Sequence, residues 1–111
     1  LMAALSAKDP YTSGHSYAVG EYAEQLARYL QLPLEEIQSA RLAAQLHDIG
    51  KLGIPDRVLK KPAALDEDEW AIMRQHPEIG ANQILQAIPE LHAACQPVLG
   101  HHERWDGSGY P

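Results

Sequence analysis

The sequence of 111 residues has one cysteine, no long apolar run and only nine lysines and arginines. The single thiol, Cys95, excludes an internal disulfide and suits a reducing compartment, so we expect a cytoplasmic protein. No apolar run approaches the roughly 20 residues that span a bilayer, which predicts no direct membrane insertion of this segment. The net charge of −6 argues against a surface that binds a nucleic-acid polymer non-specifically.

The alternation typical of β-strands is also absent, and apolar residues recur instead at helical spacing. With 45% hydrophobic residues, the chain is long enough to bury one core. These features predict an all-α fold in a single domain over residues 1–111. After a first helix that ends near Lys8, the expected helices cover approximately residues 15–31, 33–49, 66–75, 77–87 and 89–100.

The helix expected at 15–31 follows a turn predicted over residues 9–14. Its apolar residues recur at helical spacing and predict a buried stripe. The stripe consists of Val19, Tyr22, Ala23, Leu26 and Leu30. His15 lies four residues before Val19 on this stripe, so its imidazole is expected to point inward.

A second helix is opened by Pro33 and is expected to end at Gly50, a residue that suits a C-cap. His47 and Asp48 then lie in its last turn. Adjacent helical residues diverge by about 100°, so the two side chains can flank one metal or reach toward two.

Further along the chain, two local signals predict helix boundaries. Asp66 suits an N-cap with Glu69 as its capping-box partner. Pro77 disfavours the helical conformation at His76, so we expect a break there and a new helix from Pro77.

Five of the six histidines fall in four separate stretches, together with one aspartate. The candidate metal ligands are His15, His47, Asp48, His76, His101 and His102. Neutral imidazole and carboxylate are good ligands for Fe, Mn, Zn, Co and Ni, and the absence of thiolate weakens the case for a structural zinc site. Asp48 is the natural bridge between two cations about 3.5–4 Å apart, which would activate a water and clamp a phosphate.

Each candidate ligand also has a plainer explanation. His15 can be a hydrogen-bonded core residue, and His76 can cap a helix. The adjacent pairs at 47–48 and 101–102 can be a surface ion pair and a polar helix end. All these explanations would have to hold at once to remove the metal site. His92 stands outside every motif and is expected on the surface.

Two features border the candidate ligands. Lys51 follows His47 and Asp48 by one turn, and it either complements the helix dipole or holds a substrate phosphate. The segment 106–111 carries two glycines that permit unusual backbone angles close to a ligand. By itself, this segment would be interpreted as a turn. Because it directly follows two candidate ligands, it is expected to form part of the rim of an active site.

The segments His47-Asp48-Ile49-Gly50-Lys51 and 101–111, which ends in Gly109-Tyr110-Pro111, resemble the HD-GYP domain, a branch of the HD phosphohydrolase superfamily. Shorter motifs at 9–16, 54–56, 61–62, 69–70 and 76–77 agree, so the resemblance covers nearly the whole chain. It implies an HD-domain helical bundle. It also implies a bacterial metal-dependent phosphodiesterase that hydrolyses cyclic di-GMP to pGpG or GMP in second-messenger signalling.

Position by position, the resemblance implies that all six candidate ligands bind metal, with Asp48 as the bridge. Asp48 and Lys51 would be the catalytic pair, with Lys51 stabilising the phosphate. Gly109, Tyr110 and Pro111 would bind substrate or contact GGDEF-type diguanylate cyclase domains. Fe or Mn is the implied metal, and ligand chemistry also permits Zn, Ni or Co.

The chain departs from the family pattern in two places. Tyr11 stands where some members carry a glutamate and hold three metals, so we expect two. The chain starts at Leu1 and stops at Pro111, which indicates a C-terminally truncated piece of a longer protein with an upstream sensor or receiver domain. The family's further helices, one with another aspartate ligand, would then be absent. Such a fragment would bind metal weakly, lack activity, expose an apolar face or form a homodimer.

Two other functions remain open. A catalytically degenerate module would dock partners without hydrolysis, although no visible ligand is lost. An HD phosphohydrolase could instead act on another nucleotide, such as a mononucleotide or cyclic GMP-AMP. The tandem His101 and His102 argue against a generic HD enzyme with one metal, but they do not separate one cyclic dinucleotide from another.

Overall fold

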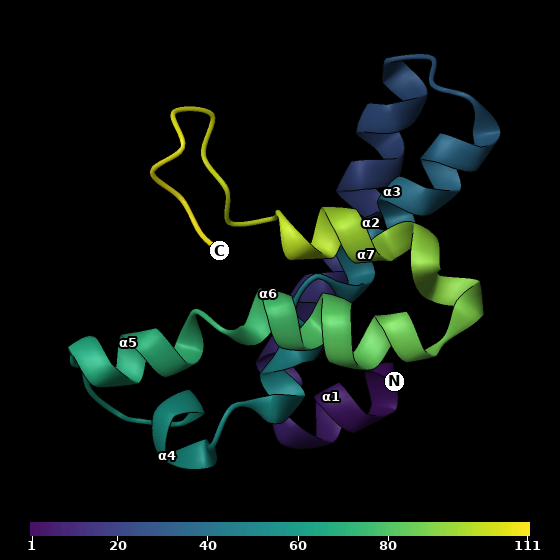
Figure 1. Ribbon diagram of the computed structural model, residues 1–111. Coiled ribbons are helices and arrows are strands. Elements are labelled where there is room, and N and C mark those ends of the chain that lie inside the picture. Colours follow the sequence, from purple (N-terminus) through teal and green to yellow (C-terminus); the bar gives the residue numbers. More distant parts are fainter.

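The computed structural model describes all residues 1–111, and every regular element in it is a helix, which confirms the predicted fold class (Figure 1). The α-helices are α1 (Met2–Lys8), α2 (Pro10–Tyr29), α3 (Leu34–Leu46), α4 (Asp56–Leu59), α5 (Glu67–Met73), α6 (His76–Glu78) and α7 (His92–Leu99). The other helical segments are η1 (Ile49–Gly53), η2 (Ile79–Ile84), η3 (Leu85–Ala87) and η4 (Pro89–Leu91). None of these helices combines the length and the apolar character needed to cross a membrane.

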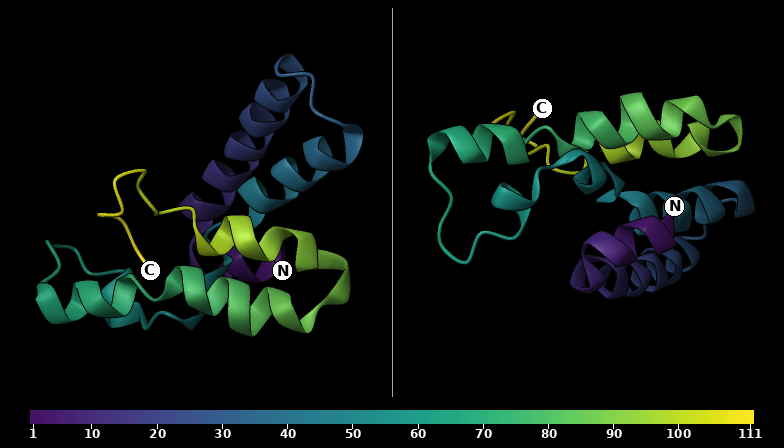
Figure 2. Two further views of the ribbon diagram at one scale, coloured as in Figure 1. Left: turned by 45° about the horizontal axis from the view of Figure 1, so that its top comes forward. Right: turned by 90° about the horizontal axis from the view of Figure 1, so that it is seen from below.

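The helices form two layers (Figure 2), with α1, α2 and α3 in one and α5, α6 and α7 in the other. The helices α2 and α3 run antiparallel as a hairpin, and α3 packs against α7 across the layers. The core lies between α1, α3, η2 and α7. It consists of Leu5, Ala43, Leu46, Ile49, Ala81, Leu85, Ala94, Cys95 and Val98. The lone cysteine is therefore a buried core residue.

The start of α2 differs from the prediction, because the turn expected at 9–14 is already helical. Asp9 is the N-cap, and its carboxylate accepts a hydrogen bond from the Thr12 amide. Pro10 occupies the first helical position, where its missing N–H costs nothing. The turn-forming residues at 9–14 thus begin the helix earlier than expected.

The predicted buried stripe of α2 is wrong. Tyr22 is 71% exposed, Leu26 59% and Leu30 57%. The buried face of α2 carries small residues instead, namely Thr12, Ser13, Ser16, Gly20 and Ala27. Small side chains let α2 approach α3 closely, since a Cβ on Gly20 would lie only 2.7 Å from a side-chain carbon of Gln45. The larger apolar residues therefore face away from the hairpin interior.

The predicted end of α3 at Gly50 is also wrong. The α-helix ends at Leu46, and the chain continues into the tighter turns of η1. Gly50 lies inside η1, where a Cβ would meet the carbonyl oxygen of His76 at 1.7 Å. Close approach of two backbones, rather than helix capping, is what requires glycine here.

The cap predicted for α5 is confirmed, because the Asp66 carboxylate accepts a hydrogen bond of 2.8 Å from the Glu69 amide. The predicted break between two helices is present but lies earlier than predicted, at Arg74 and Gln75. His76 is the first residue of α6, and Pro77 sits in the first turn, where no intrahelical donor is needed. A nearly continuous helical rod therefore runs from His76 through η2 and η3.

Candidate metal centre

The buried carboxylate of Asp48, a residue only 6% exposed, lies at the centre of the histidine cluster. One of its oxygens, Oδ2, lies 3.2 Å from Nε2 of His47. The other, Oδ1, lies 3.3 Å from Nε2 of His76 and 3.6 Å from Nε2 of His101. These rings come from the end of α3, the start of α6 and the turn after α7. Stretches distant in sequence thus converge on one aspartate.

Three of the rings are oriented in the same way by the backbone. In each of them, Nδ1 lies close to the backbone carbonyl oxygen three residues earlier. The distance is 2.5 Å from His47 to Ala44, 2.8 Å from His76 to Met73 and 2.6 Å from His101 to Val98. A carbonyl only accepts, so Nδ1 of each ring donates, and Nε2 of the neutral ring carries the free lone pair. This is the orientation that outer-shell partners give to metal-binding histidines.

The centre consequently has an excess of acceptors. Nε2 of His76 faces Nε2 of His101 at 3.2 Å, and both face the Asp48 carboxylate. Lone pairs directed at one another repel unless a cation lies between them. The donor set of imidazole nitrogen and carboxylate oxygen therefore fits a divalent metal.

The pKa of Asp48 indicates an ionised carboxylate, whereas the pKa values of His102 and His47 shift in opposite directions. Burial would raise the pKa of Asp48, but the neighbouring imidazoles of His101, His47 and His76 outweigh it and hold this pKa far below its usual range. Burial, together with the neighbouring His101, lowers the pKa of His102 to about 4. For His47, burial is outweighed by the hydrogen bond with Asp48, which raises its pKa.

All six candidate ligands are brought together in two groups. One contains Asp48, His76, His101 and His102, and the other contains His15, His47 and Asp48. Within each group the candidate ligand atoms lie within 4.8 Å of one another, and Asp48 belongs to both. Asp48 is thus the one residue common to the two groups, and its role as a bridge stays a prediction.

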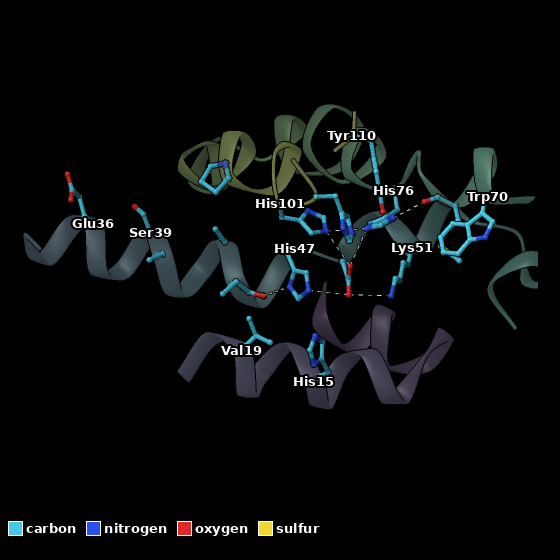
Figure 3. Close-up of a pocket in the computed structure, with 17 residues that line it drawn as sticks. His15, Val19, Glu36, Ser39, His47, Lys51, Trp70, His76, His101 and Tyr110 are labelled. Atoms are coloured by element: carbon cyan, nitrogen blue, oxygen red, sulfur yellow. Dashed lines mark hydrogen bonds and ion pairs between the residues drawn. The ribbon is translucent and has the colours of Figure 1, made fainter. Parts of the chain in front are cut away.

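The inward orientation predicted for His15 is wrong, because the residue is exposed. Its ring faces the cavity, with its centroid 5.6 Å from that of His47 (Figure 3). The prediction failed because the side of α2 that carries His15 and Val19 borders the cavity instead of the core. His92, in contrast, is exposed as predicted.

A cavity of about 1000 Å³ opens over the cluster. Lys51 lines it, with Nζ 3.3 Å from Asp48 Oδ2. Of the predicted substrate-binding residues after the ligands, only Tyr110 lines the cavity, whereas Gly109 and Pro111 do not. Trp70 also lines the cavity, a position that the sequence analysis did not assign to it. The sequence pattern around Trp70 was a weak indication, since a tryptophan near the start of a helix is explained by packing as readily as by a place in a cavity wall.

The helical fold thus carries a candidate metal site, in which two imidazole groups share an aspartate, beside a lysine and a cavity of about 1000 Å³. The family model described as "HD domain" matches residues 1–111, so the chain belongs to the HD domain family. This finding confirms the family resemblance seen in the motifs around His47 and His101.

Curated relatives point in the same direction. The chain is 43% identical, over 96% of its length, to a cyclic di-GMP phosphodiesterase of Pseudomonas aeruginosa. It is 42% identical, over 94% of its length, to a cyclic di-GMP phosphodiesterase of Thermotoga maritima. It is 40% identical, over 97% of its length, to a 3'3'-cGAMP-specific phosphodiesterase of Vibrio cholerae. The chain spans 26%, 28% and 21% of these three proteins, respectively.

Proposed function

We propose that this chain carries the catalytic centre of a metal-dependent phosphodiesterase that hydrolyses cyclic di-GMP to pGpG or GMP. The observation that carries the proposal is the Asp48 carboxylate shared by two groups of imidazoles beside Lys51. The names of the relatives from Pseudomonas aeruginosa and Thermotoga maritima support cyclic di-GMP as the substrate. The predicted diguanylate cyclase, upstream domain and homodimer contacts stay predictions.

Two divalent cations, with Fe or Mn as the expected metals, would supply Lewis-acid chemistry that activates a water and neutralises phosphate charge. The chain's own residues prepare the site for them. The low pKa of Asp48 keeps its carboxylate ionised. The backbone carbonyls of Ala44, Met73 and Val98 fix three rings with Nε2 directed at the centre.

Substrate binding falls to side chains around the cavity. Lys51 places an ammonium group next to the cluster, where it can bind a non-bridging phosphate oxygen. Tyr110 and Trp70 add aromatic surface to the cavity wall. A cavity of about 1000 Å³ is at the upper end of the size usual for small-molecule sites.

Hydrolysis of 3'3'-cGAMP is the second candidate, favoured by the relative from Vibrio cholerae. The test is an assay of the full-length protein, loaded with Mn²⁺ or Fe²⁺, against both cyclic dinucleotides, with products separated by chromatography. We expect turnover of cyclic di-GMP that His47→Ala abolishes. His92→Ala is the matched control, because His92 is exposed and bonds only the Gln86 carbonyl. Absence of turnover in a protein that holds both metals would refute the proposal.

Lys51→Ala is expected to lower kcat about 100-fold while the metal content stays unchanged. The reason is that Lys51 donates to the charge that develops on the phosphate, and removing one such donor costs roughly two orders of magnitude. Metal analysis and steady-state kinetics measure the two quantities. Lys60→Ala is the control, because the Lys60 side chain is 56% exposed and pairs only weakly with Asp56 at 3.9 Å. Equal kcat in Lys51→Ala and the wild type would exclude this role.

A further inference from the structure

The ring of His102 is positioned differently from those of His47, His76 and His101. Those three rings are anchored by backbone carbonyls, whereas neither nitrogen of the His102 ring has a hydrogen bond. Instead, the ring of Tyr110 stacks on His102, with 4.7 Å between centroids and 16° between planes. The His102 ring also lies 4.1 Å from the His101 ring and 5.0 Å from the His76 ring, so Tyr110 is its one aromatic contact outside the candidate ligands.

The loop between His102 and Tyr110 is folded back to make this stack. The Tyr110 amide donates a hydrogen bond of 3.3 Å to the carbonyl oxygen of His102. Gly109 permits the return, because a Cβ there would lie 2.3 Å from the same carbonyl oxygen and 2.5 Å from the Arg104 amide nitrogen. The backbone and the ring of Tyr110 therefore both contact His102.

Tyr110 is itself contacted by Arg74, at the end of α5. The guanidinium carbon of Arg74 lies 5.7 Å from the centroid of the Tyr110 ring and 5.7 Å from that of the Trp70 ring. Arg74 has no ion pair with any carboxylate, so these two rings are its identified side-chain partners. A cation over an aromatic face is attracted by the ring quadrupole. Trp70, Arg74, Tyr110 and His102 consequently form a continuous stacked row that ends at the cluster.

We propose that Arg74 and Tyr110 are positioning residues for His102, and that this row sets the affinity of the metal held by Asp48, His76, His101 and His102. The inference rests on the proposed metal-dependent function and adds to it a role for the C-terminal loop. Tyr110 acts on the metal through its stack with His102, and Arg74 acts through Tyr110. Outer-shell partners of this kind alter metal affinity about 10- to 100-fold when they are removed.

Titration of the metal-free full-length protein with Mn²⁺, followed by electron paramagnetic resonance, tests the role of Tyr110. We expect Tyr110→Ala to weaken one of two Mn²⁺ sites about tenfold and to leave the other unchanged. Tyr110→Phe keeps the ring and is expected to retain wild-type affinity. Tyr29→Ala is the matched control, because Tyr29 is 83% exposed and lies at the far end of α2.

The role of Arg74 is tested by the same titration. Arg74→Gln is expected to weaken the same Mn²⁺ site by a smaller factor, and Arg74→Lys to restore part of the affinity because it keeps the charge. Adding Arg74→Gln to Tyr110→Ala should cause no further loss, since Arg74 acts through the tyrosine. Arg57→Gln, at an exposed arginine of α4, controls for the loss of a positive charge.

Two outcomes would overturn the inference. Unchanged affinity at both Mn²⁺ sites in Tyr110→Ala, with a raised KM for cyclic di-GMP, would make Tyr110 a substrate contact only. Equal losses in Tyr110→Phe and Tyr110→Ala would assign the effect to the hydroxyl instead of the ring. Failure of the proposed function looks different, because the wild type would then bind Mn²⁺ and hydrolyse no cyclic dinucleotide.

Discussion

Asp48→Ala is expected to remove bound metal and hydrolysis together. Asp48 is the only residue common to both ligand groups, so its loss takes an oxygen ligand from each. Lewis-acid stabilisation is worth several kcal/mol at the transition state, and each 1.36 kcal/mol is tenfold in rate. We therefore expect a fall in kcat/KM of about 10³-fold or more, measured with cyclic di-GMP alongside metal analysis by mass spectrometry.

Two further variants separate loss of the carboxylate from loss of structure. Asp48→Asn conserves the side-chain volume and removes the charge, so it should also lose metal while the helical circular dichroism persists. Asp68→Ala removes an exposed aspartate from the first turn of α5 and should keep both metal and activity. Hydrolysis at the wild-type rate in Asp48→Ala would contradict the catalytic role of the carboxylate.

Gly50→Ala is expected to disrupt the centre although it replaces none of the candidate ligands. The added Cβ would lie 1.7 Å from the His76 carbonyl oxygen and 2.7 Å from the Gly80 amide nitrogen, and both are backbone atoms. Because backbone cannot yield as a flexible side chain does, η1 and the rod that begins at His76 must separate. A misplacement of about 1 Å can cost about 100-fold in rate, and overpacking costs about 1–3 kcal/mol of stability.

Gly14→Ala is the matched control for this substitution. Gly14 lies in α2, is exposed, and a Cβ there would meet no atom within 4 Å. Alanine in place of a helical glycine should stabilise the protein by about 0.4–1 kcal/mol. Thermal unfolding should therefore show a lower stability for Gly50→Ala and a higher stability for Gly14→Ala. Mn²⁺ binding should be weakened in Gly50→Ala alone. A Gly50→Ala protein with the stability and metal content of the wild type would contradict the close packing of η1 against His76.

Local signals in the sequence were sufficient for part of the fold. The cap at Asp66 is made between neighbours in the chain, so the pattern alone predicted it correctly. The periodic apolar residues likewise indicated helices near their observed positions. Helix starts at Pro10 and His76 were misplaced, because a proline fits both a turn and the first turn of a helix. Burial of α2 was assigned to the wrong face for another reason, since it depends on how closely α3 approaches.

The sequence by itself determined the types of ligand, since imidazole, carboxylate and lysine chemistry belongs to the residues and needs no fold to be recognised. It also carried the motifs that indicated the HD domain family. Only the tertiary structure decided that the imidazole rings meet at Asp48 and which of their nitrogens face it. It also decided that Tyr110 stacks on His102 and that Arg74 contacts Tyr110. The physical reason is that convergence depends on contacts between residues far apart in the chain. Gly50, which looked like a helix cap, shows this most clearly, because its requirement comes from a backbone 26 positions away at His76.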